Sequence, residues 1–327
     1  GGERPGPSDA FAIDSGEHYW SISSRHPETS DGLLRVAGAR SLLFRGYESE
    51  LGIHTYSSHI DPSGSRLRNG CFVHVSINDQ EGELVARGDA LGVAPLYYRQ
   101  WGERLLLSSH SGLIMRPGDT RDALCWLALL QTGSPLGDRT IVEEVRRLPA
   151  GSELRAKGHH VQVSRWFDQD ELPPGEEPIE EDTYERVERV FHESVERCLA
   201  LAAGPHVLPL SSGYDSRRIF GSLHRRGAEF RTVTAESLSH KNGRYFNIDS
   251  VLAPKIAEAH GIEWSLVEAS HGESFAADSA ARDTLIGSET FMHTWAVRLH
   301  RWLSRQPSSL VWDGLAGDVF GYCGWFD

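Results

Sequence analysis

The chain has 327 residues, of which 39% are hydrophobic and 24% charged, so collagen-like, coiled-coil and wholly disordered architectures are excluded. Lys and Arg number 33 and Asp and Glu 46, which gives a formal net charge of −13 and no general attraction for nucleic acids or anionic membranes. The length predicts two domains or one large one.

Cysteine usage and apolar runs indicate the compartment. No apolar run is long enough to span a bilayer, and no basic segment followed by an apolar one opens the chain as a secretory signal would. The histidines form no H-E-x-x-H pattern, so we expect no structural metal among them. The cysteines lie far apart without a C-x-x-C pair, which excludes a disulfide scaffold and a zinc ribbon and favours a reducing cytoplasm. They are Cys71, Cys125, Cys198 and Cys323.

The first part of the chain, residues 1–167, is predicted to be a domain rich in short strands. Gly or Pro stands between several apolar or alternating segments, which is typical of an antiparallel sheet layer. A short helix is predicted at Asp122–Gln131 and a turn at Leu148–Gly151. The predicted strands are Cys71–Asn78, Glu83–Arg87, Leu96–Tyr98, Leu105–Ser109, Ser152–Leu154 and Val161–Val163.

An acidic segment rich in Pro and Gly, residues 168–178, is interpreted as a linker because it cannot bury much apolar surface. After it the pattern changes to alternating helices and strands, which predicts a second domain, 179–327, with a doubly wound parallel sheet. The predicted helices are Glu181–Ala203, Ser216–Arg226 and Asp249–His260, and the predicted strands are His206–Leu210, Arg231–Ala235, Glu263–Val267 and Leu310–Trp312.

One turn of the second domain carries the clearest chemical signal. Ser211-Ser212-Gly213-Tyr214-Asp215-Ser216 follows the first strand and leads into its helix. A turn of small residues at the start of a helix presents backbone N–H groups to phosphate, and a carboxylate beside it is suited to Mg²⁺. The structural alternative is an ordinary Ser/Gly turn in which Asp215 caps the helix.

A second loop of the same character follows the strand predicted at Leu310–Trp312. It reads Asp313-Gly314-Leu315-Ala316-Gly317-Asp318 and again puts glycines and a carboxylate at the carboxyl end of a strand. Asp215 and Asp318 would then converge on one crevice, because parallel strands end at the same edge of their sheet. The pair favours a metal site over the structural alternative.

These two loops resemble a known family. SSGYDSR, residues 211–217, resembles the S-G-G-x-D-S pyrophosphate loop of the asparagine-synthetase-like ATP pyrophosphatases, and DGLAGDVFG, residues 313–321, resembles their later S-G-x-G-x-D-E-x-x-G loop. In the first half, residues 88–98 are similar to the family's R-D-x-x-G-x-x-P-L-Y-Y segment and residues 148–151 to its L-P-P-G. The motifs cover most of the chain in the family's order.

The resemblance implies an Ntn-hydrolase-like layered α/β glutaminase-like domain, followed by a doubly wound synthetase domain of the adenine nucleotide α-hydrolase-like class. A working glutaminase of this family has its nucleophilic Cys at the N-terminus, whereas no Cys precedes Cys71, which lies in a predicted strand as a small hydrophobe. We therefore expect an inactive glutaminase-like domain, as in β-lactam synthetases and lasso-peptide cyclases. The resemblance also implies that the second domain is incomplete at its C-terminal end.

The same resemblance implies ATP and Mg²⁺ as cofactors. The β- and γ-phosphates are expected at Ser211, Ser212, Gly213 and Ser216, and adenine along Leu210 and Ala235. In the second loop, Gly314 is also expected to contact ATP. Mg²⁺ is expected on Asp215 and Asp318, which we also count with the catalytic residues.

The expected reaction is adenylation of a substrate carboxylate followed by attack of an amine, which gives an amide, AMP and pyrophosphate. Glu289 resembles the family's catalytic Glu and is the candidate base for the amine, with His293 as a second candidate.

The expected partners are a small-molecule or peptide carboxylate and an amine, with no nucleic acid or membrane, and a homodimer is possible. Two alternatives stay open: a glutamine-dependent asparagine synthetase, which needs an N-terminal Cys, and a non-catalytic scaffold.

Overall fold

The computed structural model divides the chain into two compact units, unit 1 (Gly1–Glu176) and unit 2 (Glu177–Asp327). This division falls inside the segment interpreted as a linker, which lies outside the described residues. The structure describes residues 10–14, 19–23, 34–37, 40–48, 52–53, 70–78, 80–167, 181–201, 204–236, 239–241, 244–286, 290, 293–307 and 310–314. Within these ranges no helix is long and apolar enough to cross a membrane.

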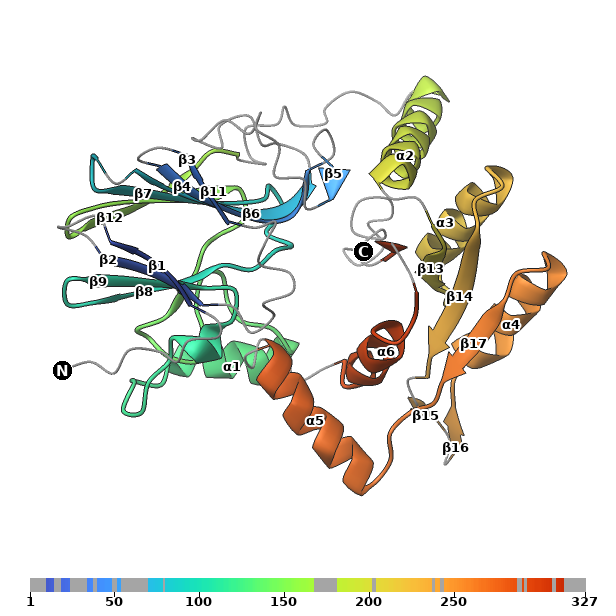
Figure 1. The fold of residues 1–327 in the computed structure, drawn as a ribbon. Helices are drawn as coiled ribbons and strands as arrows, with labels where there is room; N and C mark the ends of the chain where they lie inside the picture. Colours follow the sequence, from blue (N-terminus) through green and yellow to red (C-terminus); the bar gives the residue numbers. More distant parts are fainter. Residues whose placement is uncertain are drawn as a thin grey trace. The chain divides into compact units, whose positions relative to one another are not determined.

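Unit 1 is built mainly from antiparallel strands (Figure 1). One sheet has the order β12-β11-β7-β6-β4-β3, with β5 added to β4; a second has the order β10-β8-β9, and β1 pairs with β2. The elements are β1 (Ala10–Asp14), β2 (Tyr19–Ser23), β3 (Leu34–Ala37), β4 (Arg40–Glu48), β5 (Gly52–Ile53), β6 (Gly70–Asn78), β7 (Glu83–Gly88), β8 (Tyr97–Trp101), β9 (Arg104–Ser108), a 3₁₀ turn (Ser111–Leu113), α1 (Ala123–Thr132), β10 (Arg146–Arg147), β11 (Ser152–Lys157) and β12 (His160–Arg165).

The core of unit 1 lies between the two larger sheets. Val73, Val75 and Ile77 alternate along β6 and so point to one face of the large sheet, where they are buried. Leu105 and Leu107 of β9, in the smaller sheet, pack against the same cluster. The predicted antiparallel layer is therefore found, and a second antiparallel layer covers it.

The carboxylate of Asp89 organises the turn that follows β7. It is fully buried, and it accepts hydrogen bonds from the backbone N–H groups of Phe72, Leu91, Val93 and Ala94 at 2.9–3.3 Å. The Asp of the R-D-like motif thus acts in the architecture of unit 1. Buried N–H groups that lose their acceptor cost free energy, so this turn depends on a single side chain.

Replacing Asp89 with Asn keeps the shape of the side chain but turns an NH₂ group toward two of the N–H donors. We expect Asp89→Asn to lower the free energy of unfolding by about 3 kcal/mol, measured by urea denaturation. Asp138→Asn is the matched control, because Asp138 is half-exposed and its ion pair with Arg146 is 3.8 Å long. Equal stabilities of the two variants would contradict the role given to Asp89.

Unit 2 contains a four-stranded parallel sheet with the order β17-β14-β13-β18. β14 lies beside β13 and β17 beside β14, so these strands follow one another in chain order across the sheet. β18, the last strand, pairs with the opposite edge of β13. The elements are α2 (Glu181–Leu201), β13 (His206–Pro209), α3 (Tyr214–Arg225), β14 (Phe230–Ala235), β15 (Ser239–Lys241), β16 (Arg244–Phe246), α4 (Asp249–Ala259), β17 (Trp264–Val267), α5 (Glu273–Ile286), α6 (Trp295–Leu303) and β18 (Leu310–Val311).

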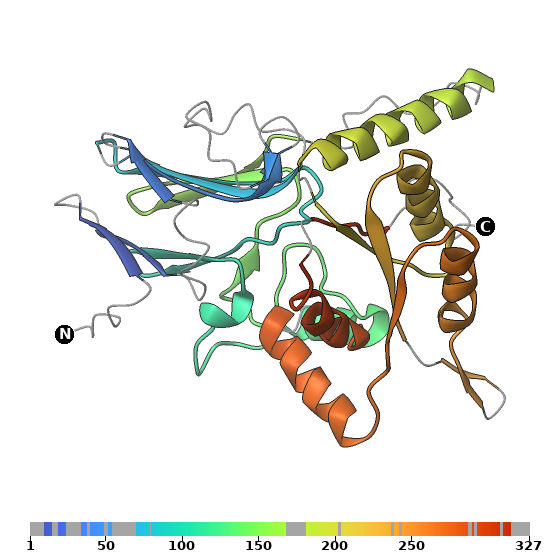
Figure 2. The ribbon, with the colours of Figure 1, turned by 45° about the vertical axis from the view of Figure 1, so that its right-hand side comes forward.

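Helices cover both faces of this sheet (Figure 2). Leu208 of β13 is buried in a cluster with residues of α2, α3 and α4, whereas its neighbour Val207 is buried with Leu299 of α6 on the opposite face. The chain is therefore a mixed α/β protein with antiparallel sheets in unit 1 and the expected parallel sheet in unit 2.

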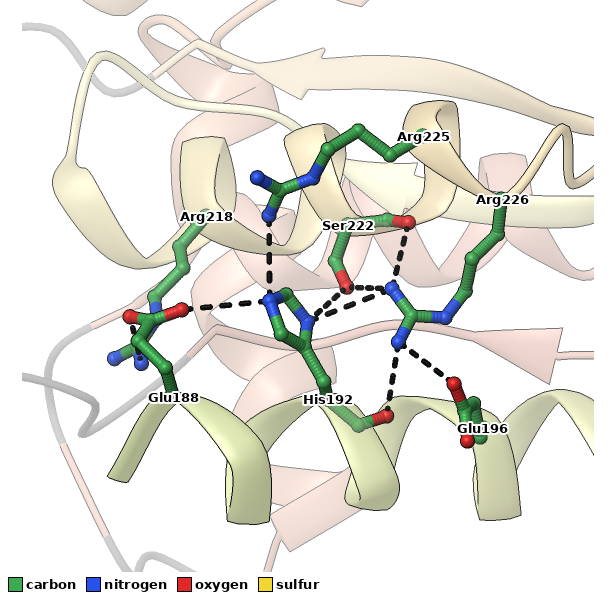
Figure 3. A network of polar contacts seen from close by, with 7 residues as sticks. All are labelled: Glu188, His192, Glu196, Arg218, Ser222, Arg225 and Arg226. Carbon is green, nitrogen blue, oxygen red and sulfur yellow. Dashed lines mark hydrogen bonds and ion pairs between the residues drawn. The ribbon is translucent and has the colours of Figure 1, made fainter. Parts of the chain in front are cut away.

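A polar network fastens α3 to α2 beside their apolar contact (Figure 3). Arg218 of α3 donates to Glu188 at 2.6 Å, and Arg226, just after α3, donates to Glu196 at 3.0 Å. His192 lies between these pairs, with its Nδ1 3.2 Å from the Ser222 hydroxyl. Such partly exposed pairs add little stability singly, but together they fix how α3 lies on α2.

Candidate functional site

The turn between β13 and α3 lies at the carboxyl end of the parallel sheet of unit 2. β13 pairs with β14 on one side and with β18 on the other, so it stands where the strand order reverses. In open α/β sheets this reversal point opens a crevice in which ligands bind. The topology therefore puts residues 211–216 at the position where a ligand is expected.

Two serines hold the shape of this turn. The backbone N–H of Ser211 donates to Ser216 Oγ at 3.1 Å, and the two hydroxyl oxygens are 2.9 Å apart. The N–H of Gly213 donates to Ser211 Oγ at 3.1 Å. Ser216 is buried, and the hydroxyl groups of both serines make hydrogen bonds within the turn.

The N-terminus of α3 has no side-chain cap. Gly213 is the N-cap residue and offers no side chain, and Asp215 lies inside the first helical turn. The structural alternative in which Asp215 caps the helix is therefore wrong. The first N–H groups of a helix have no partner within the helix and carry the positive end of its dipole, so this terminus is suited to an anion.

Ser212, which stands where the similar motif has Gly, occupies its place without strain. His293 is the one non-glycine residue of the described ranges with a positive φ, so Ser212 does not need the left-handed conformation that glycine favours. Arg217, the other departure, donates from Nε to the carbonyl of Gly213 at 3.1 Å, and its guanidinium lies 4.6 Å from the ring centroid of Tyr214.

Gly314, which follows β18, closely approaches the start of α3. A Cβ atom at Gly314 would lie 3.0 Å from the backbone N of Ser216 and 3.2 Å from Cβ of Asp215. Contacts this short need a neighbour to shift, so the position favours glycine. Gly314 and the first turn of α3 therefore lie in contact.

The start of α4 contributes two residues that sequence reasoning did not identify. Asp249 Oδ1 accepts hydrogen bonds from the N–H of Ser212 at 2.7 Å and from its hydroxyl at 2.6 Å. Asn247 Oδ1 accepts from the N–H of Asp249 at 2.8 Å, while its Nδ2 is buried without a hydrogen-bond partner among the described residues. The one signal in the sequence was the acidic residue at the predicted start of this helix.

The residues expected to border adenine lie at the end of the sheet. The N–H of Leu210 donates to the carbonyl of Val233, and its own carbonyl accepts from Thr234 Oγ1, so the sheet already uses both groups. Ala235 is the last residue of β14 and is half-buried.

Asp318 and Glu289 lie outside the described residues. His293 is described: it is exposed, its φ is +60°, and it precedes α6. Within the described ranges no three His, Cys, Asp or Glu residues are grouped so that they could hold a metal ion. Asp215 is therefore the one expected metal ligand whose position is described.

Cys71 of β6 is not activated as a nucleophile. Burial, with a smaller contribution from the charge of Asp89, raises the pKa of its thiol to about 11. The thiolate is the reactive form, so at neutral pH this side chain is almost wholly the unreactive thiol. This fits its interpretation as a small hydrophobe of the strand.

We expect alkylation of Cys71 by iodoacetamide at pH 7 to be roughly two orders of magnitude slower than that of free cysteine. The rate should rise with pH toward the thiol pKa of about 11, because the thiolate fraction rises with it. Peptide mass spectrometry against free cysteine measures both. Rapid labelling at pH 7, or glutamine hydrolysis that Cys71→Ala abolishes, would contradict this assignment.

No protein-family model matches the sequence, and no curated protein matches it. Among solved structures, a glutamine phosphoribosylpyrophosphate amidotransferase from B. subtilis, complexed with ADP and GMP, matches with a TM-score of 0.25 and 11% identity over 68% of this chain and 52% of that chain. An allosteric regulatory enzyme of purine biosynthesis matches with a TM-score of 0.25 and 12% identity over 79% and 60%.

The chain thus spans between about half and three fifths of these two proteins. With a TM-score of 0.25, neither match assigns a fold to this chain or a role to any of its residues.

Proposed function

We propose that unit 2 binds ATP at the N-terminus of α3 and that the protein is an ATP-dependent amide ligase. The observation that carries the proposal is the uncapped start of α3, at the carboxyl end of a central parallel strand, with Gly314 packed against its first turn. In this proposal a substrate carboxylate is adenylated and then joined to an amine, with release of AMP and pyrophosphate. The resemblance of both loops to the asparagine-synthetase-like ATP pyrophosphatases supports it.

The residues at this helix start fit a phosphate group. The N–H groups of the first turn of α3 and the helix dipole favour negative charge, and the absence of a Cβ at Gly314 lets that residue lie against them. The buried Nδ2 of Asn247 is a donor that has no acceptor in the part of the chain that the structure describes, and it lies two residues from Asp249, which holds Ser212. A buried donor of this kind fits a site that takes an acceptor-rich ligand.

Asp215 fits a magnesium ligand. A carboxylate in the first turn of α3 lies beside the proposed phosphates, where carboxylate and phosphate oxygens are the ligands that Mg²⁺ prefers. Bound there, Mg²⁺ would neutralise charge on the departing pyrophosphate. Asp318 of the second loop is the proposed second ligand.

The proposed reaction has two steps, and each step forms one bond as another breaks. A carboxylate oxygen bonds to the α-phosphorus of ATP as the bond to pyrophosphate breaks, and the amine nitrogen then bonds to the acyl carbon as AMP leaves. The residues at the start of α3 hold the phosphates in line for the first step. Glu289 takes the proton of the amine in the second, and exposed His293 is the alternative base.

In this proposal unit 1 is an Ntn-hydrolase-like domain without glutaminase activity. Its antiparallel layers enclose a packed core, and Asp89 serves its architecture. The raised thiol pKa of Cys71 supports the absence of a nucleophile at that residue. Cys71 therefore takes no part in the proposed reaction.

ATP–pyrophosphate exchange with a panel of carboxylic acids tests the adenylation step. We expect Asp215→Asn to lower exchange by about 10²-fold or more, because Asn is nearly isosteric but carries no charge to hold Mg²⁺. Asp182→Asn, an exposed position on α2, is the control and should exchange as the wild type does. Exchange near the wild-type rate in Asp215→Asn would refute the metal role, and a wild type inert with every acid would favour a scaffold.

Glu289→Gln separates the second step from the first. We expect this variant to keep pyrophosphate exchange and to lose amide formation by about 10²–10⁴-fold, since a base for the amine acts only after adenylation. The two rates are measured side by side on one purified protein. A parallel fall of both would make Glu289 a binding or structural residue, and His293 would become the base to test.

A further inference from the structure

Asp249, at the first position of α4, lies far from the β13–α3 turn in the sequence but contacts it directly. Its Oδ1 accepts both donors of Ser212, the backbone N–H at 2.7 Å and the hydroxyl at 2.6 Å. Hydrogen bonds to an ionised acceptor are the stronger kind, and both converge on one oxygen. The start of α4 thereby fixes the middle of the β13–α3 turn.

The bond to the Ser212 N–H fixes the orientation of one peptide plane. That N–H belongs to the same peptide group as the carbonyl of Ser211, and a planar trans peptide points the two in opposite directions. The strong restraint on this peptide group is at its N–H, where Asp249 Oδ1 accepts at 2.7 Å. A flip of this peptide, which would exchange N–H and C=O at the turn, has to break the contact to Asp249.

The neighbouring peptide groups are held by other residues. The Ser211 N–H donates to Ser216 Oγ, and the Gly213 N–H donates to Ser211 Oγ, so these bonds stay within the turn and α3. Asp249 therefore supplies the restraint that comes from another helix. It is itself held in place, because Asn247 Oδ1 accepts its backbone N–H.

We propose that Asp249 is a positioning residue that holds the β13–α3 turn in its anion-binding shape by fixing Ser212. The inference rests on the proposed function, since the anion is the phosphate chain of ATP. Asp249 does not contact that anion in this assignment but acts through Ser212. The rival role, in which the carboxylate competes with phosphate for the donors of Ser212, predicts the opposite effect of its removal.

Calorimetric titration with magnesium pyrophosphate tests the assignment on the full chain. We expect Asp249→Ala to bind about tenfold more weakly than the wild type, because both restraints on Ser212 are lost. Asp249→Asn should stay within about threefold of the wild type, because its Oδ1 still accepts both bonds. Glu258→Ala, an exposed carboxylate on the same helix, should bind as the wild type does. This rescue by Asn separates positioning from charge.

Ser212→Ala serves where Asp249→Ala does not fold, as judged by circular dichroism, and should give a smaller loss because the backbone bond remains. Unchanged or tighter binding by Asp249→Ala, or equal losses in the Ala and Asn variants, would overturn the positioning role. A wild type that binds neither pyrophosphate nor ATP would overturn the proposed function instead. The two failures are distinguished by the wild-type titration alone.

Discussion

The uncapped start of α3 is the constraint on which the candidate site depends. Gly213 supplies no capping side chain, which makes the first helical turn, at the positive end of the dipole, suited to an anion. Three described contacts surround it: Ser216 Oγ accepts from the N–H of Ser211, Asp249 accepts from Ser212, and Gly314 lies against the first turn of the helix. The sheet topology and the α2–α3 network fix the helix that carries it.

The two units use carboxylates in different ways. Asp89 of unit 1 is fully buried and accepts four backbone hydrogen bonds, so its motif defines a turn. Asp215 of unit 2 lies partly exposed in the first turn of an uncapped helix, where a cation and a phosphate could share it. Similar short motifs thus have an architectural role in one unit and a proposed chemical role in the other.

The parts predicted well from the sequence are those with strong periodicity or a local motif. β6, α2 and the alternation of β13, α3, β14, α4 and β17 were predicted within a few residues, because apolar spacing reports which face is buried. α5 was missed because its charged and small residues form no apolar stripe. The role of Asp249 could not be predicted, since it lies 37 residues from Ser212 and the contact exists only in the fold. α3 begins two residues before its predicted start, which places Asp215 inside the helix.

Hydrogen–deuterium exchange with and without magnesium pyrophosphate tests the central claim most directly, because it reports where on the chain the anion protects backbone N–H groups. The account predicts new protection in the peptides that cover residues 211–216 and 313–314, with the strands of unit 1 unchanged. Protection confined to unit 1, or binding that leaves residues 211–216 unprotected, would contradict a phosphate site at the start of α3.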